Sequence, residues 1–252
     1  MSVNLGFQNF KSFLGEFKTD LLSKIGVQIS TLYLSQIAAL ILGVVTGIIN
    51  TRILGPEGYG LFTFFFSFTT FIVLFFRFGF FTSASLLAAQ VINKNEEREI
   101  VGASIIIALL IGISYSFTIF ILSFFVDQIF NINIGWLMRY LSFVLTPLPF
   151  QLLIPNLARG TNKISMLALF YVVPSVIYII GALTLIQIIP IQAYYFILLN
   201  TFSIIISSTI ILYIFNPVFK NIRGTVKKIF EKNKEYGFHV YAGQVADQST
   251  AK

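Results

Sequence analysis

Arg77 is the residue of this sequence with the greatest chemical potential, because it lies near the middle of a long apolar stretch, residues 61–91. Burying an arginine at the centre of a membrane costs from about 3 to more than 10 kcal/mol, so such a side chain faces a wet cavity or a partner. No Asp or Glu lies deep in another apolar stretch to pair with it. We interpret Arg77 as a cavity residue whose planar guanidinium could bind a phosphate group. The alternative is a structural arginine that bonds helix carbonyls.

Three other polar residues are candidates for the same cavity. Arg139 lies close after Trp136, and Arg52 lies at the end of the first apolar stretch. Both positions are typical of interface anchors, but with Arg77 they could form a basic track from the middle of the membrane to its outer face. Gln36 could hydrogen-bond substrate hydroxyl groups or hold a neighbouring helix.

Metal and cofactor chemistry find no support in the residue types. The chain has no cysteine, and its one histidine, His239, lies in a basic tail without partner ligands. No DxD-type acidic pair of a metal-dependent glycosyltransferase is present. We therefore expect no enzyme activity, no metal and no cofactor.

The elements that must position these residues are membrane helices. The 252 residues are 56% hydrophobic and 11% charged, against about 25% charged in soluble domains, and the mean hydropathy is +0.86. A membrane-spanning helix needs roughly 20 apolar residues, whereas a barrel strand needs about ten. The predicted fold is therefore an all-α integral membrane protein with six spans, at 27–49, 61–91, 101–126, 136–157, 166–189 and 192–215.

The basic residues predict the orientation of these spans. They fall in the N-terminal arm, the second loop, the fourth loop and the tail, whereas the intervening loops contain Arg52 alone. By the positive-inside rule, both termini are then cytoplasmic in a multi-pass protein of the cell membrane. The net charge of +7 is explained by this placement, so nucleic acid is not an expected partner.

Two flanking segments have amphipathic patterns. Residues 1–26 and 216–239 combine apolar residues at three- and four-residue spacing with lysines and arginines, for example Phe219, Ile222, Val226 and Ile229 in the tail. We expect both to lie in the cytoplasmic interface with their apolar faces against membrane lipids. Residues 27–215 then form the transmembrane unit, and residues 240–252 the start of a seventh span.

The stretch 50–62, "NTRILGPEGYGLF", predicts a tight extracytoplasmic hairpin between the first two spans. Gly55 can adopt a left-handed conformation, and Pro56 ends the first helix. Gly58 and Gly60 would let the next helix pack closely. In the fourth and fifth spans, Pro147, Pro149, Pro155 and Pro174 predict kinks.

The wording of this hairpin, "TRILGPEGYGLFTFFFSF", resembles the first-hairpin signature of polysaccharide-export flippases of the multidrug/oligosaccharidyl-lipid/polysaccharide exporter superfamily. "FRFGFFTSASLLAAQ", "PNLARGTNKISMLALFYVVPS" and "YAGQVADQSTAK" are similar to later parts of that family. The resemblance implies two six-helix lobes around a cavity that opens alternately to each side. It also implies a lipid-linked oligosaccharide or glycolipid as the substrate that moves outward.

This sequence has six spans, equivalent to one lobe, and ends where a seventh would begin. We expect an N-terminal fragment, whose partner is a missing C-terminal lobe; a half-transporter that pairs with a second chain is the alternative. Two other functions stay open. A cation-coupled multidrug exporter of the same superfamily would need a buried carboxylate, which the apolar spans lack. A non-transporting structural or assembly protein is the other.

Overall fold

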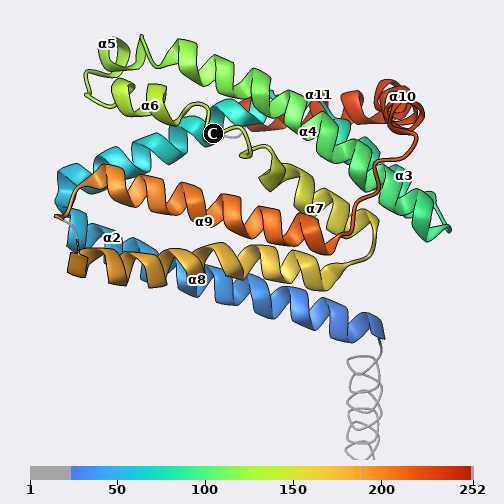
Figure 1. Cartoon of the computed structure of the whole chain (residues 1–252), viewed down its shortest axis with the longest axis horizontal. Coiled ribbons are helices and arrows are strands. Elements are labelled where there is room, and N and C mark those ends of the chain that lie inside the picture. Colours follow the sequence, from blue (N-terminus) through green and yellow to red (C-terminus); the bar gives the residue numbers. More distant parts are fainter. Residues whose placement is uncertain (1–23, 189, 251–252) are drawn as a thin grey trace, which may run out of the picture.

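The computed structural model describes residues 24–188 and 190–250, which form helices and no strand (Figure 1). The predicted amphipathic segment 1–26 lies almost wholly outside the described residues. In chain order the helices are α2 (Lys24–Phe75), α3 (Phe80–Gln90), α4 (Lys94–Leu122), α5 (Val126–Phe130), α6 (Gly135–Leu141), α7 (Phe150–Gly160), α8 (Ile164–Ile188), α9 (Ala193–Ile214), α10 (Ile222–Lys232), the π-helix η1 (Asn233–Gly237) and α11 (Phe238–Thr250).

The longest helices have the composition of membrane spans. Among the described residues, four helices are long and apolar enough to cross a bilayer: α2 from Gly26 onward, α4, α8 and α9. Their outward faces carry many exposed large apolar side chains, as expected of surfaces that meet lipid. The all-helical membrane architecture is thus supported, while the count of six spans stays a prediction.

Helix α2 contains the first hairpin. Its ribbon turns back sharply at one end of the molecule, which divides it into two arms (Figure 1). At the turn Gly55 has φ 67° and ψ 179°, so its φ is positive but its ψ is extended, a combination that is essentially restricted to glycine. A Cβ on Gly55 would meet nothing within 4 Å, so the requirement for glycine comes from the backbone alone.

The close packing expected of the two following glycines is present at one of them. A Cβ on Gly58 would lie 3.1 Å from the Cβ of Leu54 and 3.7 Å from that of Ala193 in α9. Around Gly60 the space is open to 4 Å. Gly58 therefore lets the start of the second arm pack closely against Leu54, while Ala193 of α9 lies at ordinary van der Waals distance.

Two predicted spans are not continuous helices. The second span, expected over 61–91, is broken between Phe75 and Phe80. The fourth, expected over 136–157, is broken between Leu141 and Phe150, where Pro147 and Pro149 remove backbone donors. The first break contains no proline, so the sequence did not predict it.

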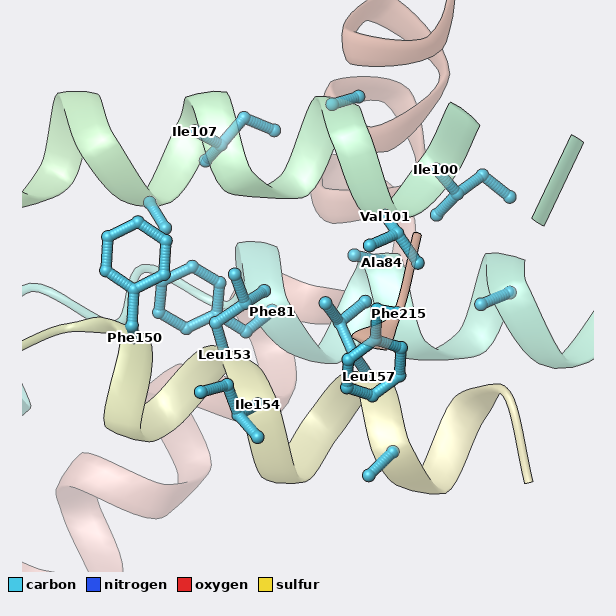
Figure 2. Packing of buried hydrophobic residues seen from close by; sticks show 14 of the residues in the cluster. Phe81, Ala84, Ile100, Val101, Ile107, Phe150, Leu153, Ile154, Leu157 and Phe215 are labelled. Atoms are coloured by element: carbon cyan, nitrogen blue, oxygen red, sulfur yellow. The ribbon is translucent and has the colours of Figure 1, made fainter. Parts of the chain in front are cut away.

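The helices enclose two apolar clusters. One lies between α3, α4 and α7, where side chains such as Phe81, Val101 and Leu157 point toward one another (Figure 2). The other lies around the second arm of α2 and includes the fully buried Phe65, Tyr115 and Tyr178. The first cluster fixes α3 against α7, and these two helices carry most of the site described below.

The tail corrects one expectation. The sequence predicts that the apolar face of 216–239 lies against lipid, but Ile229 of α10 is fully buried in the α3–α4–α7 cluster, and Val226 packs against the same cluster. The ring of Phe230 lies 4.7 Å from that of Phe80 in α3. Ile229 and Val226 therefore face protein, whereas Phe219 and Phe230 remain exposed.

The segments expected on the cytoplasmic side lie together. Glu97 at the start of α4 pairs with Lys163 of the α7–α8 loop at 3.0 Å, and Glu96 pairs with Lys228 of α10 at 3.1 Å. Arg98 donates to the carbonyl of Asn216 at 2.8 Å. This grouping is consistent with the alternation of basic loops; which side of the membrane the end faces stays a prediction.

Candidate functional site

A cavity of about 280 Å³ lies where the second span is broken. Four helical segments meet there: the break and start of α3, one face of α7, the middle of α8, and α11. The cavity is lined by Arg77, Gly79, Phe81, Thr82, Gln151, Leu152, Pro155, Asn156, Arg159, Tyr171, Tyr241 and Gln244. Among these residues are two arginines and no Asp or Glu.

Arg77 lies within the break itself. Helix α2 ends in a tightened turn, in which the N–H of Phe76 donates to the carbonyl of Val73 at 3.1 Å. The chain then passes through Phe78 and Gly79 with φ of 45° and 80° before α3 begins. The Nε of Arg77 is buried and has no hydrogen-bond partner among the described residues. The side chain of Arg77 also lines the cavity, where a guanidinium can bind an anionic ligand.

Helix α7 contributes one polar face and one apolar face. Leu153 and Leu157 are fully buried in the α3–α4–α7 cluster. The cavity side carries Gln151, Asn156 and Arg159, which fall on one broad face at 3.6 residues per turn. Because Leu153 and Leu157 face the apolar cluster, the opposite side of α7 faces the cavity.

The end of α7 places Arg159 near the charged end of the molecule. The N–H of Lys163 donates to the carbonyl of Ala158 at 2.8 Å, while Asn162 has φ 54°, a capped termination in the left-handed conformation. Arg159 lies in the last turn of α7, and its side chain lines the cavity from that end. The cavity therefore extends from the helix break toward the charged end.

Close contacts between backbones hold α3 against α7. A Cβ on Gly160 would collide with the carbonyl of Ser85, so only glycine fits there. The hydroxyl of Ser85 donates to the carbonyl of Asn156 at 2.8 Å, and the amide of Asn156 donates to the carbonyl of Leu152 at 2.7 Å. The amide oxygen of Asn156 remains an acceptor beside the cavity.

The structure places the other sequence candidates outside this cavity. The guanidinium of Arg139 lies 4.0 Å above the ring of Phe124, and its Nε is buried without a hydrogen-bond partner among the described residues. Arg52 is exposed on α2 next to the Gly55 turn, and Gln36 is exposed on the first arm of α2. The structure therefore does not bring Arg77, Arg139 and Arg52 together in one cavity.

Other expected features can be placed as well. His239 is exposed. Within the described residues no group of three His, Cys, Asp or Glu side chains could hold a metal ion. The chemistry available in the cavity is thus that of guanidinium, amide and hydroxyl groups.

Several lining residues were missed from the sequence. The predicted fourth span ends at residue 157 and so leaves Arg159 in the following loop, although Gln151, Asn156 and Arg159 share a broad helical face that could have indicated them. Tyr241 and Gln244 gave no such signal, because they lie far along the chain from the break and reach it only through the packing of α10 on α3.

Comparison with known proteins gives one match. A family model described as "Polysaccharide biosynthesis protein" matches residues 25–251 of the chain. No curated protein and no solved structure matches the chain.

Proposed function

Since the chain belongs to the polysaccharide biosynthesis protein family, we propose that it works in a flippase that exports lipid-linked oligosaccharides or polysaccharide repeat units across the cell membrane. Membership confirms the family resemblance seen in the first hairpin and later segments. The substrate, the alternating-access mechanism and the two-lobe assembly are the parts that we propose here.

The observation that carries the proposal is the charge of the cavity. Arg77 and Arg159 line it, and no carboxylate does. A lipid-linked oligosaccharide carries its sugars on a phosphate or pyrophosphate, which a planar guanidinium binds in a bidentate manner. Because Arg77 and Arg159 both line the cavity, a phosphate bound there would meet two guanidinium groups.

The remaining lining residues suit sugars. Gln151, Asn156 and Gln244 offer amide donors and acceptors, and Tyr171 and Tyr241 offer hydroxyl groups. Sugar hydroxyl groups need partners of both kinds, which amides provide in one side chain. The position of the cavity at a broken helix also matches transporters, in which interrupted spans form substrate sites.

A cation-coupled multidrug exporter is less favoured by the same cavity. Ion coupling in a membrane site uses a titratable or negatively charged oxygen, and the cavity is lined by neither Asp nor Glu. In our proposal the chain provides one six-span lobe, with both termini cytoplasmic. A second lobe, from further sequence or from a second chain, completes the pathway across the membrane.

Substrate binding tests the proposal directly. The chain in lipid nanodiscs should bind a fluorescent undecaprenyl-pyrophosphate saccharide more tightly than the same saccharide on an uncharged lipid. Arg77→Gln and Arg159→Gln should each weaken binding by roughly tenfold to a hundredfold, the loss expected for a hydrogen bond to a charged group. Arg139→Gln is the matched control, since Arg139 contacts Phe124 away from the cavity.

Transport provides the second readout. The encoding gene, expressed in its full reading frame in a flippase-deficient strain, should restore export, and Arg77→Gln should abolish it at equal membrane levels. Arg77→Lys should retain part of the activity, because the charge remains while the bidentate geometry is lost. Equal binding of charged and uncharged lipids, or full export by Arg77→Gln, would contradict the proposal.

A further inference from the structure

The tail helices reach across the molecule to the break in the second span. Helices α10 and α11 are joined by the π-helix η1, so that residues 222–250 form one helical run next to α3 and α4 (Figure 1). Besides the ring contact between Phe78 and Tyr241, this run makes hydrogen bonds to the backbone of the break. None of them is explained by the apolar packing of α10.

The break exposes backbone carbonyls that need donors. A helix end leaves its last carbonyls without intrahelical partners, and in an apolar environment each unpaired group is costly. The hydroxyl of Tyr241 donates to the carbonyl of Phe75 at 3.1 Å. The side-chain amide of Asn233 donates to the carbonyl of Phe78 at 3.0 Å. The tail therefore supplies the donors that the interrupted helix lacks.

Two glycines bring the backbones into direct contact. A Cβ on Gly79 would collide with the carbonyl of Gly237, and a Cβ on Gly237 would collide with the hydroxyl of Ser83 and the side chain of Asn233. The same Ser83 hydroxyl lies 3.2 Å from Oδ1 of Asn233. Any larger side chain at position 237 must push η1 away from the break.

The break is strained and depends on these contacts. Phe78 has φ 45°, a conformation that bulky residues rarely adopt and that persists only where the surroundings impose it. Asn233 is buried beside the break. It begins a π-helical turn, which ends at Gly237. The wider turn of a π-helix places Asn233 and Gly237 about one turn apart, both against the break.

We propose that Asn233 and Gly237 are positioning residues that keep the second span broken and so hold Arg77 in the cavity. Without Asn233 the carbonyl of Phe78 loses its donor, and a displaced η1 would also carry Tyr241 away from the carbonyl of Phe75; winding of residues 76–79 into a helix that joins α2 to α3 would then pair these carbonyls. Winding would rotate Arg77 about the helix axis, by roughly 100° for each residue added. The anion-binding role of Arg77 rests on the proposed function, whereas the geometry of the break does not.

Cysteine labelling tests this arrangement, because the chain contains no cysteine of its own. Arg77→Cys and Gln151→Cys, made in separate variants, report on the break and on the α7 wall of the same cavity. When Gly237→Ala is added to Arg77→Cys, the reaction of the thiol at position 77 with a water-soluble reagent should slow by about tenfold or more, since the side chain turns away from the cavity. The thiol at position 151 should react as before, which general misfolding would not permit.

Gly243→Ala is the matched control, because a Cβ on Gly243 meets nothing within 4 Å. An unchanged labelling rate at position 77 in folded Gly237→Ala would overturn the proposal, and so would equal slowing in Gly243→Ala. If Gly237→Ala does not fold, Asn233→Ala replaces it, with Asn95→Ala as control because Asn95 is exposed. Equal labelling rates at position 77 in that pair would also overturn the proposal.

The labelling result is separate from the substrate assay. Slower labelling at position 77, together with no binding of the pyrophosphate-linked saccharide by the unsubstituted chain, would support the positioning role and reject the proposed function. Saccharide binding by the unsubstituted chain, together with unchanged labelling at position 77, would support the proposed function and reject the positioning role.

Discussion

The second and fourth spans are both broken, but their breaks are stabilised by different parts of the chain. In the fourth span, backbone bonds close most of the gap locally, such as Leu148 N–H to the carbonyl of Leu145 at 2.8 Å and Phe150 N–H to that of Pro147 at 3.0 Å. In the second span, side chains more than 150 residues away, Asn233 and Tyr241, donate to the exposed carbonyls.

This difference shows what makes a break in a membrane helix part of a site. Pro147 and Pro149 interrupt the fourth span through their own covalent structure, and Ser116 of α4 donates to the carbonyl of Ser142 beside them. The break at Arg77 contains no proline, and two of its carbonyls accept hydrogen bonds from the distant tail. A break that depends on distant contacts can respond to their movement, which would suit the proposed role of Arg77 in binding and releasing a substrate.

The largest expected effect is that of Gly79→Ala. Gly79 has φ 80°, and its added Cβ would collide with the carbonyl of Gly237. A left-handed conformation costs a non-glycine residue about 1–2 kcal/mol, and the collision adds to this, so we expect a loss of at least about 2 kcal/mol. Denaturation in detergent micelles measures it, with Gly60→Ala as control because its Cβ would be free. Equal stability of both variants would contradict the difference between the breaks.

A smaller effect is expected from removing single donors at each break. Asn233→Ala leaves the carbonyl of Phe78 without its donor and should cost about 1–3 kcal/mol. Ser116→Ala removes the hydroxyl that donates to the carbonyl of Ser142 at 2.6 Å in the fourth span, and should cost about 1 kcal/mol. If Ser116→Ala proved the more destabilising change in the same unfolding assay, the fourth span would be the one that depends on tertiary contacts.

The smallest effect on stability is expected from Pro147→Ala combined with Pro149→Ala. The new N–H groups can bond to the carbonyls of Phe143 and Leu145 in helical geometry, so stability should change by less than about 1 kcal/mol. Amide hydrogen exchange over residues 142–149 should slow, because this segment gains helical bonds. Unchanged exchange would show that neighbouring helices, rather than the prolines, impose the break.

Much of the fold follows from local composition. Long apolar runs predicted membrane helices, the prolines predicted the interruption of the fourth span, and the Gly55–Pro56 pair predicted the first turn. The basic loops predicted which segments lie at one end, and the ion pairs Glu97–Lys163 and Glu96–Lys228 are consistent with this. The hairpin wording identified the family. Each of these properties depends on residues that are close in sequence, so it can be predicted without knowing how the helices pack.

The site was only partly readable. Arg77 was found because a charge in an apolar run is costly wherever the run packs. Its surroundings were decided by tertiary structure: Arg159 shares the cavity because α7 is rotated by its buried leucines, and Tyr241 and Gln244 reach it because α10 packs on α3. Arg139 and Arg52 looked equivalent to Arg77 in the sequence, yet one stacks on Phe124 and the other is exposed.

The sequence by itself determined that the long helices suit a membrane, that the fold is helical and which family the chain belongs to, because each depends on residue types and short-range order. The tertiary structure decided where the second span breaks and which side chains meet there. Its reason is physical: exposed carbonyls in an apolar environment are stable only beside a donor, and the donors at this break come from Asn233 and Tyr241, distant in sequence.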